Sequence, residues 1–121
     1  MPYQVTQQNE PNTQTATIAA SGNITTTIRL PPGHELAAII MPAAWTAAGI
    51  TFKAGYTTGT ADVFGSDGNE VALVVVAVHY VPIPTGLLHG ANYIKIRSGT
   101  AATPVAQAAE RTLTLITQPA P

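Results

Sequence analysis

The chain contains no cysteine among its 121 residues, which excludes disulfide bonds, zinc–thiolate sites and thiol nucleophiles. Charge is also scarce: Asp, Glu, Lys and Arg make up only 9% of the sequence, whereas a typical soluble domain has about 25%. Five basic residues stand against six acidic ones, so no basic field exists to attract nucleic acid. Such a neutral, weakly solvated surface favours a protein that neighbours cover in an assembly over an isolated enzyme.

The first fifteen residues, MPYQVTQQNEPNTQT, lack the basic start and apolar core of a signal peptide. They are rich in Gln, Asn, Thr and Pro without a hydrophobic period, which predicts an extended or disordered N-terminal arm over residues 1–15. We expect this arm to be mobile in an isolated subunit and to become ordered against an exposed strand edge of a partner. Residues 118–121 are predicted to form a short tail, and residues 16–117 one folded domain.

The longest uncharged run is LAAIIMPAAWTAAGITF, residues 36–52. It is marginal in length for a bilayer span, and Pro42 near its middle would cost a helix about 3 kcal/mol. The run therefore predicts two strands joined by the corner PAAWTAAG. We expect Trp45 on that corner to plug one end of the core with its N–H bonded to a carbonyl; the alternative is a carbohydrate-stacking role.

Alternating apolar and polar residues predict strands in NITTTIRL, GITFKAGY, NYIKIRS and RTLTLIT. Asp67-Gly68 predicts a hairpin turn, because glycine accepts positive φ. The segment VALVVVAVHY, residues 71–80, is apolar on both faces and is therefore expected to be an inner strand covered on both sides. Six to eight strands with no convincing helix predict an all-β, single-domain antiparallel β-sandwich of jelly-roll or Greek-key type.

Three histidines are present, His34, His79 and His89, and none has a second histidine at the spacing of a local metal pair. Structural or surface roles are therefore favoured for them over a metal site.

The one acidic cluster consists of Asp62, Asp67, Asn69 and Glu70. Calcium prefers such oxygen ligands, but the spacing does not match an EF-hand loop. Because turn chemistry already explains Asp67 and Asn69, we favour a structural role over a calcium site.

No set of residues has the pattern of a catalytic site. The three serines lie in predicted turns without a nucleophile-elbow motif: Ser21, Ser66 and Ser98. One strand face carries Tyr93, Lys95 and Arg97, which suit either a polar ligand or a solvated or interface face, and we favour the latter. No catalytic residue, metal or cofactor is expected.

Two segments, IIMPAAWTAAGITFKAGY and YIKIRSGTAATPVAQAAERTLTLIT, resemble a family of small tailed-bacteriophage virion structural proteins, usually of unassigned function. The resemblance runs over residues 39–116 and is weaker in the middle, where SDGNE at residues 66–70 is similar to the family's DGTEY-like turn. It implies a protein of the head surface, located in the virion after synthesis in the host bacterial cytoplasm. Proteins of this kind often form trimers, which suggests a homotrimer here by analogy alone.

The leading hypothesis is a head decoration or cement protein that binds the major capsid protein or other virion proteins, with no nucleic-acid or membrane partner. The alternative is a glycan- or host-surface-binding module of a head spike or fibre. That module would need an exposed aromatic platform, for which Trp45 and four tyrosines are available. A glycan hydrolase would need two carboxylates facing each other across a cleft and ranks last, so the chain is not expected to be an enzyme.

Overall fold

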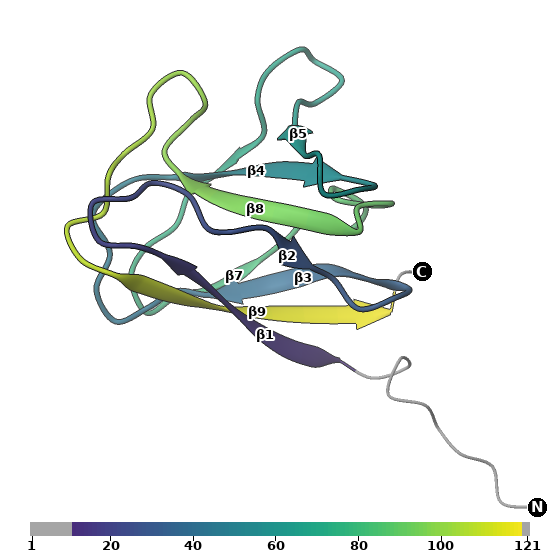
Figure 1. Cartoon of the computed structure of the whole chain (residues 1–121), viewed down its shortest axis with the longest axis horizontal. Coiled ribbons are helices and arrows are strands. Elements are labelled where there is room, and N and C mark those ends of the chain that lie inside the picture. The colour runs from purple at the N-terminus through teal and green to yellow at the C-terminus, as the bar shows by residue number, and fades with distance from the viewer. Residues whose placement is uncertain (1–10, 120–121) are drawn as a thin grey trace, which may run out of the picture.

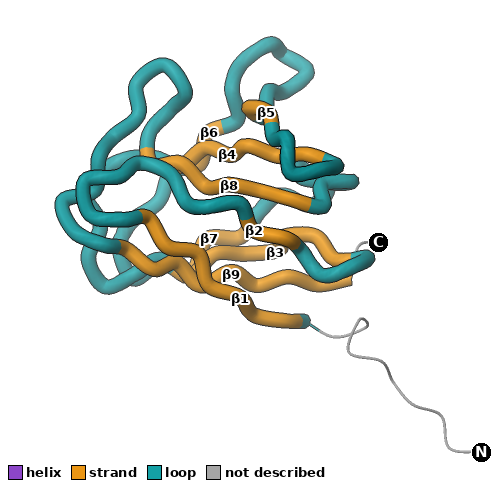
Figure 2. The backbone as a smooth tube through the Cα atoms, in the orientation of Figure 1, coloured by secondary structure: helices purple, strands orange, loops and turns teal. Residues whose placement is uncertain are grey.

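The computed structural model describes residues 11–119, which fold into two antiparallel sheets that face each other as two layers (Figure 1). The strands are β1 (Asn12–Ile18), β2 (Ile28–Arg29), β3 (His34–Ile40), β4 (Ile50–Gly55), β5 (Ala61–Asp62), β6 (Ala72–Leu73), β7 (Tyr80–Pro82), β8 (Tyr93–Ser98) and β9 (Arg111–Pro119). Figure 2 shows strands and loops only, so the described part of the chain has no helix that could cross a membrane.

The strand order identifies the sandwich as a jelly roll. One sheet, sheet A, has the order β1-β9-β3-β7, and the other, sheet B, has the order β2-β8-β4-β5, with β6 also pairing with β4. From β1 to β4 the chain changes sheet at every connection, and it does so again from β7 to β9, which gives the interleaved pairing of two Greek keys. The predicted all-β sandwich is thus confirmed.

The core lies between the sheets and follows the two-residue period of the strands. Phe52, Ile94, Ile96, Leu113 and Leu115 are fully buried, and in each strand they alternate with residues on the outer face. The alternation predicted for residues 92–98 and 111–117 is therefore confirmed at these positions. Burial of these large side chains supplies the main stabilisation of the fold, at roughly 1.5–3 kcal/mol for each.

Residues 36–52 form two strands joined by a corner, as predicted from Pro42 and the uncharged run. The strands β3 and β4 lie in different sheets, so the corner carries the chain across one end of the sandwich. Trp45 packs against the core cluster, and its indole N–H donates to the carbonyl of Ala48 at 3.0 Å. The predicted plug is confirmed, because the ring caps apolar side chains while its one donor is satisfied.

The inner strand predicted over residues 71–80 is wrong. Only residues 72–73 are strand within sheet B; residues 74–79 then leave it and lead to β7, the edge strand of sheet A. Val75 alone of the valines in this stretch is buried, whereas Val74 and Val78 are exposed. An uninterrupted apolar run does not distinguish a covered strand from an exposed crossing, because periodicity carries no information when every residue is apolar.

The sandwich begins earlier and ends later than the predicted range of residues 16–117. Strand β1 starts at Asn12, and Asn12–Thr15 pair with Thr117–Thr114 of β9; strand β9 continues through Pro119. The inner-face positions in the first half of β1 are Asn12 and Gln14 rather than apolar residues, so residues 12–15 show no hydrophobic period. Residues 12–15 of the arm expected to be mobile are thus part of β1; residues 1–10 of that arm lie outside the described residues, as do residues 120–121.

Candidate functional site

The outer face of sheet B carries a network of charged side chains around Arg97. This side chain is only 9% exposed and donates from Nη2 to Asp62 Oδ1 at 2.7 Å and from Nη1 to Glu70 Oε2 at 3.0 Å. Glu70 Oε1 in turn accepts the backbone N–H of Ala101 at 3.0 Å. The network fastens the β5–β6 hairpin and the β8–β9 loop, both of which rise above sheet B in Figure 2, to the sheet.

These contacts decide the role of the predicted acidic cluster. Asp62 and Glu70 neutralise Arg97, while Asp67 stabilises the hairpin turn by accepting Asn69 N at 3.0 Å and Asn69 Nδ2 at 3.3 Å. The hydrogen bond from the Asn69 backbone N–H is the main cause that lowers the pKa of Asp67. Gly68 follows with φ of 85°, as the predicted hairpin requires. Residues 11–119 contain no group of His, Asp and Glu arranged to hold a metal ion.

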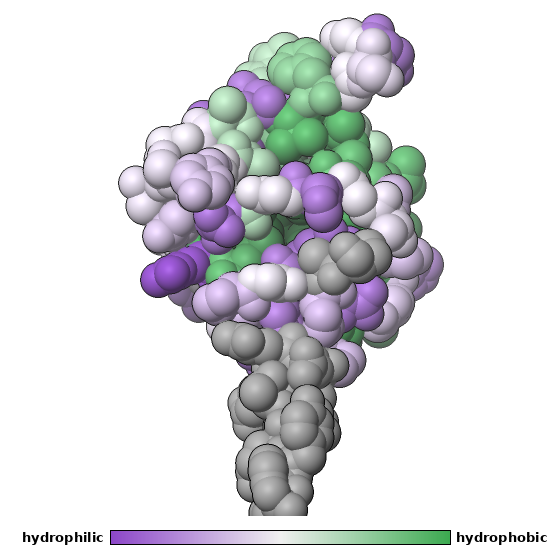
Figure 3. All heavy atoms as spheres, turned by 90° about the vertical axis from the view of Figure 1, so that its right-hand side faces the viewer, coloured by the Kyte–Doolittle hydropathy of each residue, from purple (hydrophilic) through white to green (hydrophobic). Residues whose placement is uncertain are grey.

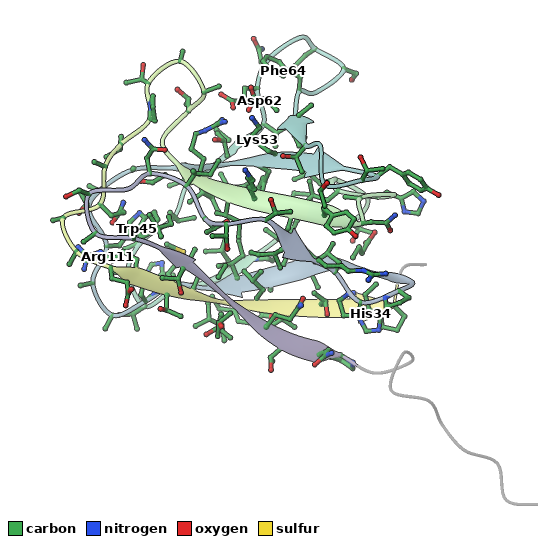
Figure 4. All side chains as sticks on the ribbon, in the orientation of Figure 1. His34, Trp45, Lys53, Asp62, Phe64 and Arg111 are labelled. Carbon is green, nitrogen blue, oxygen red and sulfur yellow. The ribbon has the colours of Figure 1, made fainter. Side chains whose placement is uncertain are left out.

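Four of the five basic residues of the chain share the outer face of sheet B. Strand register places Arg29 beside Tyr93, and Lys53 directly opposite Lys95, with Arg97 two residues farther along β8. Figure 4 shows Lys53 and Asp62 on this outer side of the sheet. Asp62 is the register partner of Lys53 but forms its ion pair with Arg97, and no carboxylate in the described chain lies within 4.0 Å of the other three cations. Four cations against two carboxylates leave this face with an excess of two positive charges.

A cleft of about 420 Å³ opens where this face meets one end of the sandwich. Its walls come from the end of β2, the end of β4 with the following loop, and the start of β8, and they consist of Arg29, Leu30, Pro32, Tyr56, Thr57, Thr58, Asn92 and Tyr93. Tyr56 is 79% exposed. Figure 3 faces this end of the molecule and shows hydrophilic and hydrophobic residues meeting at the surface.

A second, smaller hollow of about 250 Å³ lies on the other side of Tyr56 and is mostly apolar. His89 lines it, and its Nδ1 lies 3.6 Å from Oε2 of Glu35, a carboxylate that is only 8% exposed. That oxygen has no hydrogen-bond partner among the described residues.

The other two histidines do not line this hollow. His34 is buried with Nδ1 3.2 Å from Thr117 Oγ1, and His79 is exposed in the loop before β7.

The three serines lie in different environments. Ser21 and Ser66 are exposed in turns, whereas Ser98 is fully buried and accepts Gln107 Nε2 at 2.7 Å. Gln107, which no sequence pattern singles out, is fully buried and also exchanges hydrogen bonds with the backbone of Thr46 at 2.8 and 3.1 Å. It therefore joins the β8–β9 loop to the Trp45 corner. An isolated amide in an alanine-rich loop gives no sequence sign of this role.

An apolar ridge runs along the side of the sandwich where the chain passes from sheet B to sheet A. It consists of Ile40, Val74, Val76, Val78 and Tyr80, all exposed. Ile40 and Tyr80 are cross-strand partners of β3 and β7, so they share a face. Val78 adopts φ of 71°, a left-handed conformation that is a genuine outlier for a β-branched residue. An exposed position does not require an apolar side chain, and a left-handed backbone disfavours a β-branched one, so neither explains the valine at this position.

Comparison with known proteins adds no assignment: no family model, no curated protein and no solved structure matches the chain.

Proposed function

We propose that this protein is a structural subunit of a tailed-bacteriophage virion, a head decoration protein that binds and stabilises the capsid surface. The sequence resemblance over residues 39–116 supports the proposal, as does the low charge content of 9%. The jelly roll is compatible with it, since this fold is frequent in viral capsid proteins, but a fold alone does not define a function. The proposal assigns the chain no enzymatic activity.

The apolar ridge is the observation that carries the proposal. Val74 is 91% exposed and Val78 is 69% exposed; isolated apolar residues at such exposure are common, whereas several of them on one segment favour an interaction surface. The left-handed φ of Val78 adds local strain of about 1–3 kcal/mol, which is characteristic of functional positions. A glycine there would remove the strain, so we infer that the valine side chain is retained because a neighbour covers it.

We propose a second copy of this chain as the occupant of the ridge, in a homotrimer that then binds the capsid. The ridge contains no charged residue, so it can be buried against the next copy around a threefold axis without placing one of its own charges in the contact. Pro82 removes one backbone N–H from edge strand β7. Contact through the side chains of the ridge is therefore favoured over extension of sheet A by a further strand.

Quantitative mass spectrometry of purified particles tests the assignment. A head decoration protein is expected in high copy number, on the order of hundreds for a head lattice, because lattice symmetry repeats each contact. A value of about a dozen or fewer would assign the chain to a neck, tail or fibre instead. Absence from the particle would contradict the virion proposal as a whole.

A specific observation supports a second candidate function, a glycan- or host-surface-binding module. Tyr56 supplies the exposed aromatic surface that such a module requires, and it lines a cleft with polar side chains around it. Trp45, which the sequence also offers for this role, packs against the core and is therefore not the platform. The two candidate functions use different surfaces, and one chain can carry both.

A further inference from the structure

We propose that the cleft beside Tyr56 binds an acidic saccharide, a sugar bearing a carboxylate, with Tyr56 and Arg29 as its main contacts. This inference rests on the second candidate function and does not depend on assembly through the apolar ridge. The cleft, at about 420 Å³, lies within the range of about 300–1,000 Å³ typical of small-molecule sites.

The cleft is held open by hydrogen bonds that do not involve a ligand. Asn92 joins its walls: its backbone N–H donates to Gly55 O at 3.0 Å, its carbonyl accepts Leu30 N at 2.9 Å, and its side-chain Nδ2 donates to Tyr56 O at 3.1 Å. The carbonyl of Arg29 accepts Gln14 Nε2 at 3.0 Å. A site whose walls are already bonded loses little conformational entropy on binding, which favours affinity.

The lining matches a sugar in both its apolar and its polar parts. The exposed ring of Tyr56 offers a flat apolar surface against which the C–H face of a pyranose can pack. Thr57 and Thr58 bring hydroxyl groups to the same cleft. Because Nδ2 of Asn92 is already bonded to a carbonyl, its Oδ1 is available to accept a sugar hydroxyl.

The charge on this face indicates that the sugar is acidic. Arg29 lines the cleft and has no carboxylate within 4.0 Å in the described chain, and a guanidinium group pairs well with a carboxylate. Lys53 and Lys95 are register partners on the adjoining face, with Asp62 opposite Lys53 on its other side. The two lysines add positive potential beside the cleft, which favours an anionic ligand. A nucleic acid suits the surface less well, because its binding depends on many phosphate contacts and this face offers only Arg29, Lys53 and Lys95 as cations outside ion pairs in the described chain.

Amide NMR titrations of the full chain test the inference with four probes: trigalacturonate, its neutral methyl ester, sialyllactose and lactose. At least one acidic saccharide is expected to shift the amide signals of Arg29, Tyr56, Asn92 and Tyr93, and to bind about tenfold or more tightly than its neutral counterpart. Tyr56→Ala and Arg29→Gln are expected to weaken that binding by about tenfold or more. The matched control Tyr80→Ala removes an exposed tyrosine from the apolar ridge and should leave binding unchanged.

The other outcomes separate this inference from the candidate function on which it rests. Equal binding of acidic and neutral saccharides at Tyr56 would overturn the acidic specificity and leave a glycan-binding module. Inorganic phosphate that binds as tightly as the saccharides, with no effect of Tyr56→Ala, would replace the saccharide site by a simple anion site. No shift with any of the four saccharides at millimolar concentration would contradict both the inference and the glycan-binding candidate.

Discussion

At the scale of single residues, Arg97 is the group on which the two loops above sheet B depend. Replacing it with methionine removes the cation that pairs with the carboxylates of Asp62 and Glu70, which are 32% and 14% exposed, and leaves Glu70 only its bond from the Ala101 N–H. We predict a loss of about 2–4 kcal/mol in unfolding free energy, somewhat below the loss for a fully buried pair, because water still reaches Asp62. Urea denaturation followed by the fluorescence of the single tryptophan measures it. The control Lys95→Met, on the same strand face, should change stability by only about 0.5 kcal/mol; an equal loss there would show that the network contributes nothing specific.

Val78 supplies a second prediction at this scale. Val78→Gly should raise the stability of the isolated subunit by about 1 kcal/mol, because glycine adopts a φ of 71° without strain. The same change should weaken self-association, since it removes an exposed side chain of the ridge. Thermal melts of monomeric protein and association constants measured in parallel distinguish the two effects. A variant that is less stable as a monomer would show that Val78 packs usefully within its own chain.

At the scale of elements, substitutions at two adjacent valines test which side of the segment between β6 and β7 packs against the core. Val75 belongs to the buried core, whereas Val74 is almost fully exposed. We predict that Val75→Ala lowers the unfolding free energy by about 1–3 kcal/mol, and Val75→Asp is expected to abolish folding. Val74→Ala should stay within about 0.5 kcal/mol. The reverse ranking, measured by urea denaturation, would place the opposite face of this segment against the core.

The elements also show how far the sequence could predict the structure. Strands β4, β8 and β9 were foreseen because their inner residues alternate with outer ones, as in Ile94, Lys95 and Ile96. Strand β1 lacks this signal because the inner-face positions of its first half are Asn12 and Gln14, and residues 71–78 lack it because they contain no polar residue to define a face. The cleft was not predictable, since Arg29, Tyr56 and Asn92 lie far apart in the sequence and meet only through strand register.

At the scale of the whole molecule, the sandwich carries two separate surfaces of different chemistry, one basic and one apolar. The outer face of sheet B and the adjoining cleft hold four of the five basic residues, while the apolar ridge holds none. The separation allows a subunit to use one surface for contact with its own copies while the other stays open to a ligand.

Only part of the basic face can be predicted from the sequence. The alternation of Tyr93, Lys95 and Arg97 is visible there, and it favours a solvated or interface face over a ligand site. Its continuation by Lys53 and Arg29 required the sheet order.

The claim that the ridge is an interface between copies is tested most directly by the molar mass in solution. Light scattering during size-exclusion chromatography at micromolar concentration should give three times the 12.5 kDa subunit mass for the native chain. The double variant Val74→Asp, Val78→Asp should elute as a folded monomer, because two charges would have to be buried in the contact. A native chain that is monomeric, or a double variant that keeps the native mass, would contradict assembly through this ridge.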